Sequence, residues 1–134
     1  MKRILLFFLV LLLCVHYSQG QMNDLSGVWV LDSIVMKDSN KSESAKSISI
    51  EDITPELIYD CPTEAEIQSD RVDVKLKDGT IFKNITYYLD NDKLEVSIVP
   101  SYLSTYKVKF ENDMMILNQV KGAIEHTYVY KLKK

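Results

Sequence analysis

The sequence predicts an all-β protein, an antiparallel up-and-down meander of about eight or nine short strands that closes into a small barrel. Apolar and polar residues alternate with a period of two in most segments. Short turns such as Asp78-Gly79 join these segments, and no helical pattern is long enough for a parallel crossover. Because closure removes exposed strand edges, we expect a barrel ahead of the alternative, a flattened two-sheet sandwich.

An apolar leader precedes the strands. A basic start is followed by the apolar run 4–15 and by small or polar residues up to Gly20, which is the layout of a secretory signal peptide. The run is shorter than the roughly 20 apolar residues that span a bilayer, and the residues before Cys14 are not the small ones that lipid attachment requires. We therefore expect a signal peptide at 1–20 and one exported β-barrel domain, periplasmic or extracellular, at 21–134.

Composition limits the partners of the domain. Without the two basic residues of the leader, 14 basic side chains remain against 19 acidic ones, a net charge of −5. Phosphate binding needs a basic face, so nucleic acid is not an expected partner. Cys61 is the only cysteine outside the leader, so no internal disulfide is expected. We expect a monomer with no stable membrane span. Asn40 and Asn84 begin glycosylation sequons, which matter only in a cell that glycosylates them.

The first strand is expected at 27–35, where Trp29, Leu31 and Val35 share one face. The polar segment 37–46 has no apolar face and is predicted to be a mobile surface loop. The segment 63–69 is ambiguous between a strand and a helical turn. The other strands are expected at 48–50, 57–61, 72–76, 81–85, 94–98, 106–110, 115–119 and 124–132.

The Asp78-Gly79 turn predicts a register. A two-residue hairpin needs positive φ at both turn positions, which this pair tolerates. Such a turn places Leu76 opposite Ile81 and Val74 opposite Lys83. Since facing residues point to the same side of a sheet, Lys83 is predicted to put one cation on the inner, apolar face.

Asn112-Asp113 and Lys121-Gly122 are predicted to make two more two-residue turns. The second of them pairs Leu117 with His126. Together the turns place four polar side chains on the inner face: Tyr106, Gln119, His126 and Tyr128.

The predicted inner face is mostly apolar with sparse polar groups, a mixture typical of a ligand site. We take six side chains as candidate ligand-binding residues: Lys83, Tyr87, Tyr106, Gln119, His126 and Tyr128. Lys83 is a candidate partner for an anionic head group. The alternative is a solid barrel in which these side chains fill the interior and bond to one another or to trapped water.

The sequence contains no pattern typical of catalysis. Cys61 and His126 are the only residues of their kinds outside the leader, and nothing in their spacing brings them together. The paired carboxylates 90/92 and 111/113 lie in predicted turns, where they favour turn geometry. No cluster has the spacing of a metal site. We expect no enzyme activity, no catalytic residue, no metal and no cofactor.

Gly27-Val28-Trp29, directly after the leader, resembles the glycine-x-tryptophan signature of lipocalins. The hairpin 106–117 and the closing segment 128–131 are similar to small secreted bacterial lipocalin-like domains. The resemblance implies that Gly27 and Trp29 are structural and that Trp29 plugs one barrel end beneath a basic residue of the last strand. Lys131 is the nearest such residue, although the predicted register turns it outward.

The same resemblance implies a carrier that binds or sequesters a small apolar molecule without chemistry. The alternative is a protein-interaction or inhibitor module with a side-chain-filled barrel. Such a module would use its loops, namely 37–46 and the stretch 101–103.

Overall fold

The computed structural model describes residues 25–40 and 44–134. The predicted signal peptide lies outside the described residues, as do positions 41–43 of the predicted loop. The elements are, in order, β1 (Gly27–Asp38), β2 (Lys46–Ile48), the 3₁₀ turn η1 (Ile50–Asp52), β3 (Glu64–Gln68), β4 (Arg71–Lys75), β5 (Ile81–Asp90), β6 (Lys93–Val99), β7 (Tyr102–Glu111), β8 (Met114–Lys121) and β9 (Ile124–Leu132).

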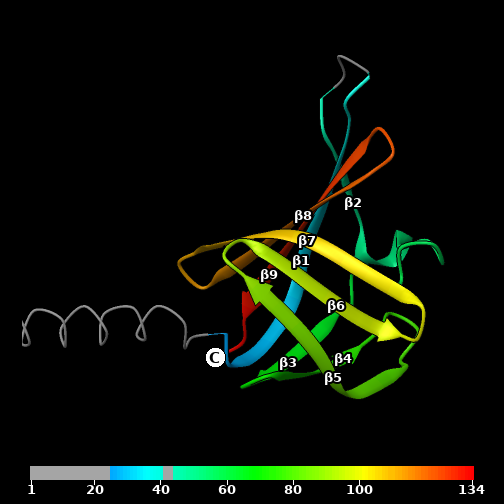
Figure 1. The fold of residues 1–134 in the computed structure, drawn as a ribbon. Coiled ribbons are helices and arrows are strands. Elements are labelled where there is room, and N and C mark those ends of the chain that lie inside the picture. Colours follow the sequence, from blue (N-terminus) through cyan, green and yellow to red (C-terminus); the bar gives the residue numbers. More distant parts are fainter. Residues whose placement is uncertain (1–24, 41–43) are drawn as a thin grey trace, which may run out of the picture.

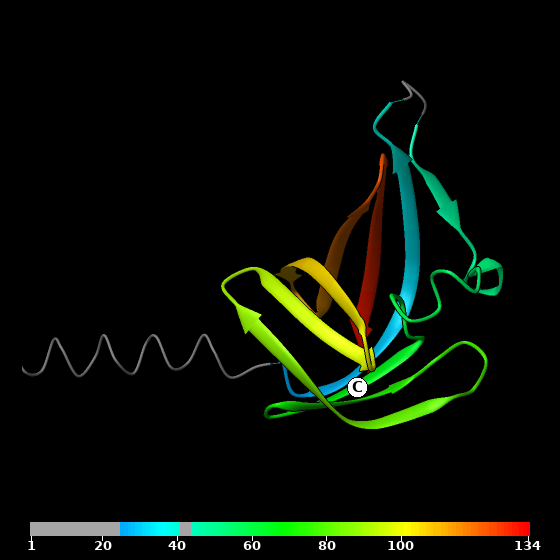
Figure 2. The same ribbon diagram turned by 45° about the vertical axis from the view of Figure 1, so that its right-hand side comes forward.

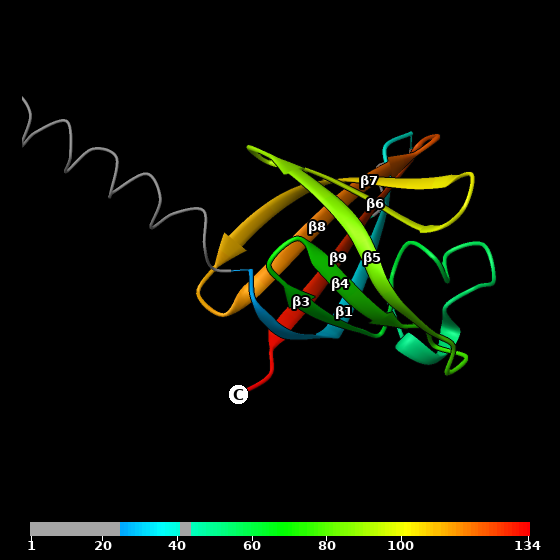
Figure 3. The ribbon, with the colours of Figure 1, turned by 60° about the horizontal axis from the view of Figure 1, so that its bottom comes forward.

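The strands form a closed antiparallel barrel, as the sequence predicts (Figures 1 and 3). From β3 to β9 each strand pairs with the next one in the chain, and β1 closes the barrel by pairing with β3 on one side and β9 on the other. Strand β2 is a ninth, additional strand that pairs with β1 alone. No helix in the described part of the chain has the length and apolar character needed to cross a membrane.

Strand β1 contains a bulge that changes which residues face inward. Leu31 pairs with Tyr130 but Ser33 pairs with Val129, so Asp32 is an extra residue in β1. Trp29 and Leu31 are buried, as predicted. After the bulge the parity reverses, so Ile34 is fully buried and the prediction that Val35 shares that face is wrong.

The β4–β5 turn has three residues, not two. The Leu76 N–H donates to the Thr80 carbonyl at 2.8 Å and the Gly79 N–H to the Leu76 carbonyl at 3.0 Å, while Gly79 has φ +90°. The third turn residue, Gly79, thus has a backbone conformation that only glycine adopts without strain. Ile81 therefore faces Lys75 instead of Leu76, and it is 56% exposed.

The same shift corrects the position predicted for Lys83. Val74 faces Phe82, and a bulge follows in β5, because Val72 faces Ile85. Asn84 has φ +57° in this bulge and is exposed, and its N–H donates to Asp73 Oδ1 at 2.8 Å. Lys83 is exposed rather than inward-facing.

The last two hairpins confirm the predicted inner face by different routes. Asn112-Asp113 forms the predicted turn, and Phe110 faces Met115. The final turn lies one residue later than predicted, at Gly122-Ala123, so Leu117 faces Tyr128 instead of His126. Because this moves the pairing by two residues, every side chain keeps its predicted side.

Three segment predictions need correction or completion. The residues 57–61 form consecutive turns and not a strand, and the ambiguous segment 63–69 contains β3. The predicted loop 37–46 is shorter than expected, since β1 runs to Asp38 and β2 begins at Lys46. Figure 2 shows β1 and β2 as a hairpin that projects beyond the barrel.

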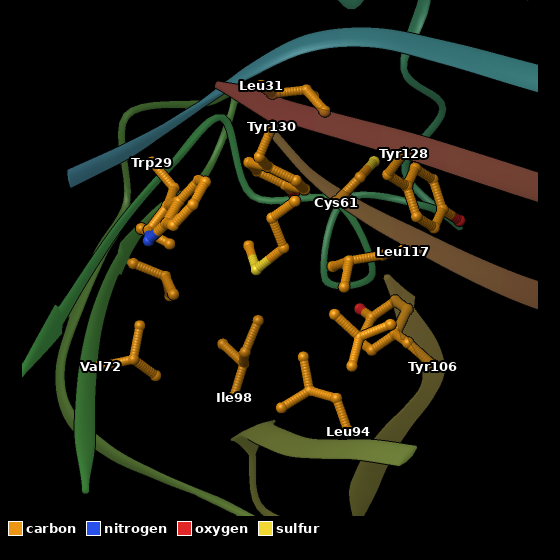
Figure 4. Packing of buried hydrophobic residues seen from close by; sticks show 14 of the residues in the cluster. Trp29, Leu31, Cys61, Val72, Leu94, Ile98, Tyr106, Leu117, Tyr128 and Tyr130 are labelled. Carbon is orange, nitrogen blue, oxygen red and sulfur yellow. The ribbon is translucent and has the colours of Figure 1, made fainter. Parts of the chain in front are cut away.

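The two barrel ends differ in what closes them. Trp29 closes the end where β1 begins and β9 finishes, near the C-terminus (Figure 1). The segment 53–62, which we call the plug, lies at the opposite end, before β3 begins (Figure 3). Between these ends, side chains such as Leu94, Ile98 and Leu117 point into the interior (Figure 4).

Candidate functional site

The barrel interior contains a small, partly open cavity. Its volume is about 60 Å³. Aliphatic side chains from the surrounding strands form most of its wall, among them Val72, Val74, Leu94, Ile98, Val108 and Leu117. The ring of Tyr106 and the plug residues Asp60 and Pro62 border it at the plug end.

Apolar packing closes the Trp29 end. The Trp29 side chain is 3% exposed and lies 6.2 Å, centroid to centroid, from the Phe110 ring. Its indole N–H donates to the Leu25 carbonyl at 2.9 Å, which satisfies the only polar atom of the ring. Lys131 is exposed and pairs with Asp32 at 3.3 Å, so the prediction that it turns outward is confirmed. Among the described residues no cation lies over the Trp29 ring, so apolar packing closes this end.

The plug closes the opposite end and is held from inside the barrel. Consecutive turns fold it back on itself, since the Leu57 N–H donates to the Thr54 carbonyl and the Asp60 N–H to the Leu57 carbonyl. Ile53, Leu57 and Cys61 bury their side chains in the core. A strand side chain also bonds to the main chain of the plug, since Tyr130 Oη on β9 donates to the Pro62 carbonyl at 2.7 Å.

The centre of the plug is Asp60, whose side chain is completely buried. Its Oδ1 accepts hydrogen bonds from Ser104 Oγ at 2.7 Å and Gln119 Nε2 at 3.3 Å. Its Oδ2 accepts one from Tyr102 Oη at 2.9 Å and another from Lys121 Nζ, with which it forms an ion pair. A buried charge is tolerated where it is paired and its lone pairs are occupied, and Asp60 meets both conditions.

These donors come from two strands that have separated. The β7–β8 ladder ends where Lys107 pairs with Asn118, although both strands continue past that point. Asp60 lies between the two parted strands, taking two hydrogen bonds from β7 and two from β8. Its carboxylate thus links β7 and β8 where their backbones do not.

The charges of the pair are stable at neutral pH. Burial raises the pKa of Asp60, but the hydrogen bonds from Lys121, Ser104, Tyr102 and Gln119 outweigh it and hold this pKa below its ordinary value. Burial also lowers the pKa of Lys121, whereas the bonds to Asp60 and Tyr102 raise it to a net value above the ordinary one. Asp60 is therefore a carboxylate and Lys121 an ammonium.

The predicted site residues divide into three groups. Tyr87 and Tyr106 line the cavity, and their hydroxyls donate to the Ser69 and Asp60 carbonyls. Gln119, Tyr128 and His126 are buried together beside Asp60, away from the cavity wall. Lys83 forms the third group by itself, since it is exposed and lies apart from the other five.

The buried polar group is connected through Gln119. Tyr128 Oη donates to Gln119 Oε1 at 3.0 Å, so Gln119 joins Tyr128 to Asp60. The His126 ring stacks on Tyr128 with centroids 6.0 Å apart. His126 Nδ1 is buried and has no hydrogen-bond partner among the described residues. Burial, together with the charge of Lys121, lowers the pKa of His126, so its imidazole is neutral at pH 7.

Cys61 lies next to Asp60 but has the properties of a core residue. It is 1% exposed, and its Sγ–H donates to the Leu57 carbonyl at 3.2 Å. Burial, followed by the negative charge of Asp60, raises the pKa of the thiol to about 12. Since the thiolate is the nucleophile, a thiol with this pKa is inert at neutral pH. The described residues also contain no group of three or more His, Cys, Asp or Glu side chains that could hold a metal.

The sequence interpretation missed Asp60. It placed Asp60 in a strand at 57–61, whereas this residue lies in a turn. One signal was present, because Tyr102, Ser104 and Tyr106 on β7 and Gln119 and Lys121 on β8 share the inward parity. An inward lysine next to an inward polar row requires a buried acid.

Comparison with protein-family models, with curated proteins and with solved structures finds no significant match.

Proposed function

We propose that this protein is a lipocalin-like carrier that binds or sequesters a small apolar molecule inside its barrel without chemical conversion. The observation that carries the proposal is the apolar cavity of about 60 Å³ inside a barrel of eight strands. Eight strands leave an interior just wide enough for packed side chains or one small ligand. The leader adds a second expectation, that the carrier acts after export.

The cavity volume limits what fits without rearrangement. An engineered apolar cavity of about 150 Å³ binds benzene, so a cavity of about 60 Å³ accepts only a ligand of a few heavy atoms. A larger ligand requires the interior side chains to shift or a closing segment to withdraw. The plug is the segment that fits this role, because Leu57 and Cys61 occupy the interior from an irregular turn and not from the sheet.

A pair of valine-to-phenylalanine substitutions tests the proposal. Val108 lines the cavity from β7, whereas Val120 on β8 is 66% exposed. Val108→Phe should fill the cavity and abolish the fluorescence gain of an apolar dye such as N-phenyl-1-naphthylamine, while Val120→Phe should leave it unchanged. Circular dichroism checks the fold, because overpacking costs about 1–3 kcal/mol. Where Val108→Phe does not fold, Ala65→Val, a smaller change in the same wall, replaces it.

Equal dye binding by the two phenylalanine variants would refute binding in the lumen. Native mass spectrometry of the protein purified from its own host complements this test. A stoichiometric small molecule, released on denaturation, would identify the natural ligand class.

One observation favours the alternative of an interaction module. Leu103 and Val120 are 59% and 66% exposed, and they lie on the two strands that separate at the plug end. Of the stretch predicted to make contacts, Tyr102 is instead bonded to Asp60. If Leu103→Ser abolishes capture of a protein partner and Val108→Phe does not, the interaction module is the better description.

A further inference from the structure

The side chains around Asp60 form a built receptor for a carboxylate. Tyr102, Ser104, Gln119 and Lys121 each direct a donor at one of the two carboxylate oxygens. Two of these donors reach each oxygen, and the ammonium supplies the balancing charge. All four stand on regular strands of the barrel, whereas Asp60 stands on the plug. The donors are thus part of the rigid frame and the carboxylate is part of the irregular segment.

The charge balance restricts what can replace Asp60 in this receptor. If the plug withdraws with nothing in its place, Lys121 loses its ion-pair partner and the buried side chains of Ser104 and Gln119 lose their acceptor, which is unfavourable. A neutral ligand in place of Asp60 still leaves Lys121 without a negatively charged partner. An incoming carboxylate restores all four hydrogen bonds and the ion pair, while Asp60 gains full hydration outside. The exchange of one carboxylate for another is therefore the least costly way to open this end.

The receptor adjoins both the cavity and solvent. Asp60 and Tyr106 border the apolar cavity, so a chain that extends from the carboxylate position runs directly into the lumen. On the outer side, an open hollow of about 370 Å³ lies over the separated strands and is lined in part by Tyr106 and Gln119. The Lys121 side chain, which does not line this hollow, is itself 35% exposed. A charged head group can thus reach the receptor from water.

We propose that Tyr102, Ser104, Gln119 and Lys121 form the head-group site for an amphipathic carboxylate, and that Asp60 fills this site from within until such a ligand displaces it. The ligand's apolar chain then lies in the lumen, enlarged by withdrawal of the plug side chains. This inference rests on the proposed function, since it requires the lumen to accept an apolar chain. It adds the chemical class of the ligand and the segment that moves.

Cys61 provides a reporter for the displacement. It is adjacent to Asp60, 1% exposed and protonated, so it should resist iodoacetamide while the plug is in place. Cys14 is the other cysteine of the chain, so Cys14→Ser leaves Cys61 as the single thiol. This variant is mixed with decanoate, with decanol or with buffer, and the rate of Cys61 alkylation is measured by mass spectrometry. We expect decanoate to raise this rate at least tenfold and decanol to leave it within twofold of buffer.

Displacement of N-phenyl-1-naphthylamine, measured in parallel, separates the two proposals. If decanol and decanoate both displace the dye and accelerate alkylation equally, the lumen binds apolar chains but the head-group site is refuted. If neither displaces the dye, the proposed function itself fails. Lys121→Met should reduce the decanoate effect on Cys61 at least tenfold and leave dye displacement by decanol unchanged, and an undiminished decanoate effect would overturn the assignment.

Chemical rescue tests the receptor independently of long ligands. Asp60→Ala removes the internal carboxylate and leaves its four donors. Formate or acetate should then raise the melting temperature of this variant by several degrees. This increase should exceed the one that chloride produces at equal ionic strength. It should also exceed the increase that formate or acetate produces in Asp32→Ala. If Asp60→Ala does not fold, Asp60→Ser takes its place. Equal responses to carboxylate and chloride would refute a receptor that is selective for carboxylates.

Discussion

Replacing Asp60 by asparagine keeps the shape of the side chain and removes its charge. The Ser104 and Tyr102 hydroxyls can rotate to suit an amide, but Lys121 has only donors and loses its ion-pair partner. Breaking a buried pair in this way costs about 3–5 kcal/mol. Since the Lys121 side chain is 35% exposed and can reach water, we expect the lower end, about 3 kcal/mol.

Urea unfolding followed by fluorescence measures this loss, because Trp29 is the only tryptophan in the chain. For a domain of about 110 residues, 3 kcal/mol corresponds to a fall in melting temperature of about 12 °C. Asp32→Asn is the matched control. It breaks the exposed pair with Lys131 and should cost at most about 0.5 kcal/mol. If Asp60→Asn costs no more than Asp32→Asn, the buried carboxylate does not hold the plug.

The pH dependence of the same variant follows from the direction of the Asp60 pKa shift. The pKa in the folded state lies below the ordinary value of 3.8, so the unfolded chain binds the proton more readily and the stability contributed by Asp60 is complete above pH 3.8. That contribution is lost as the pH falls through the folded-state pKa. The difference in unfolding free energy between wild type and Asp60→Asn should thus be constant between about pH 5 and 7 and should narrow below pH 3.8.

Three further predictions concern the Trp29 end and the outer face. Trp29→Ala should lower the unfolding free energy by about 3–5 kcal/mol, the range for a buried aromatic, in chemical denaturation followed by circular dichroism. Gly27→Ala should cost about 1–3 kcal/mol, because Gly27 has φ +139° and an added Cβ would lie 2.7 Å from Leu132 Cδ1; a stable variant would mean that β1 can shift. Lys83→Ala should change neither dye affinity nor melting temperature, since Lys83 is exposed, and a loss of affinity would return it to the ligand site.

The sequence predicts the closed barrel because alternation and turn chemistry are local signals. The β7–β8 turn forms at its two predicted residues, and the β8–β9 turn still gives the right inner face because its displacement by one residue moves the strand pairing by two. An insertion of one residue, by contrast, places the following side chains on the wrong face of the sheet. The third residue of the β4–β5 turn reverses the side on which residues 81–83 lie, until the bulge at Asn84 restores it, and the bulge at Asp32 reverses the side of the β1 residues after it.

The candidate site is harder to predict because its central residue obeys no period. Tyr106, Gln119, His126 and Tyr128 lie on strands, so period two is enough to place them inside. Asp60 is inside because consecutive turns carry it there, and its donors come from strands more than 40 positions away in the chain. Only the separation of β7 and β8, a tertiary feature, makes room for it.

The chemical difference between the two barrel ends determines which end can open. At the Trp29 end, closure rests on ring packing with Phe110, and water offers nothing that replaces buried apolar contact. At the plug end, closure rests on one carboxylate and four donors. Another anion of the same shape can replace these polar contacts, so the cost of opening depends on what is present in solution. Under the proposed function, the Trp29 end is therefore the one that stays closed, and the plug end is the one through which a carrier of this kind would take up and release its ligand.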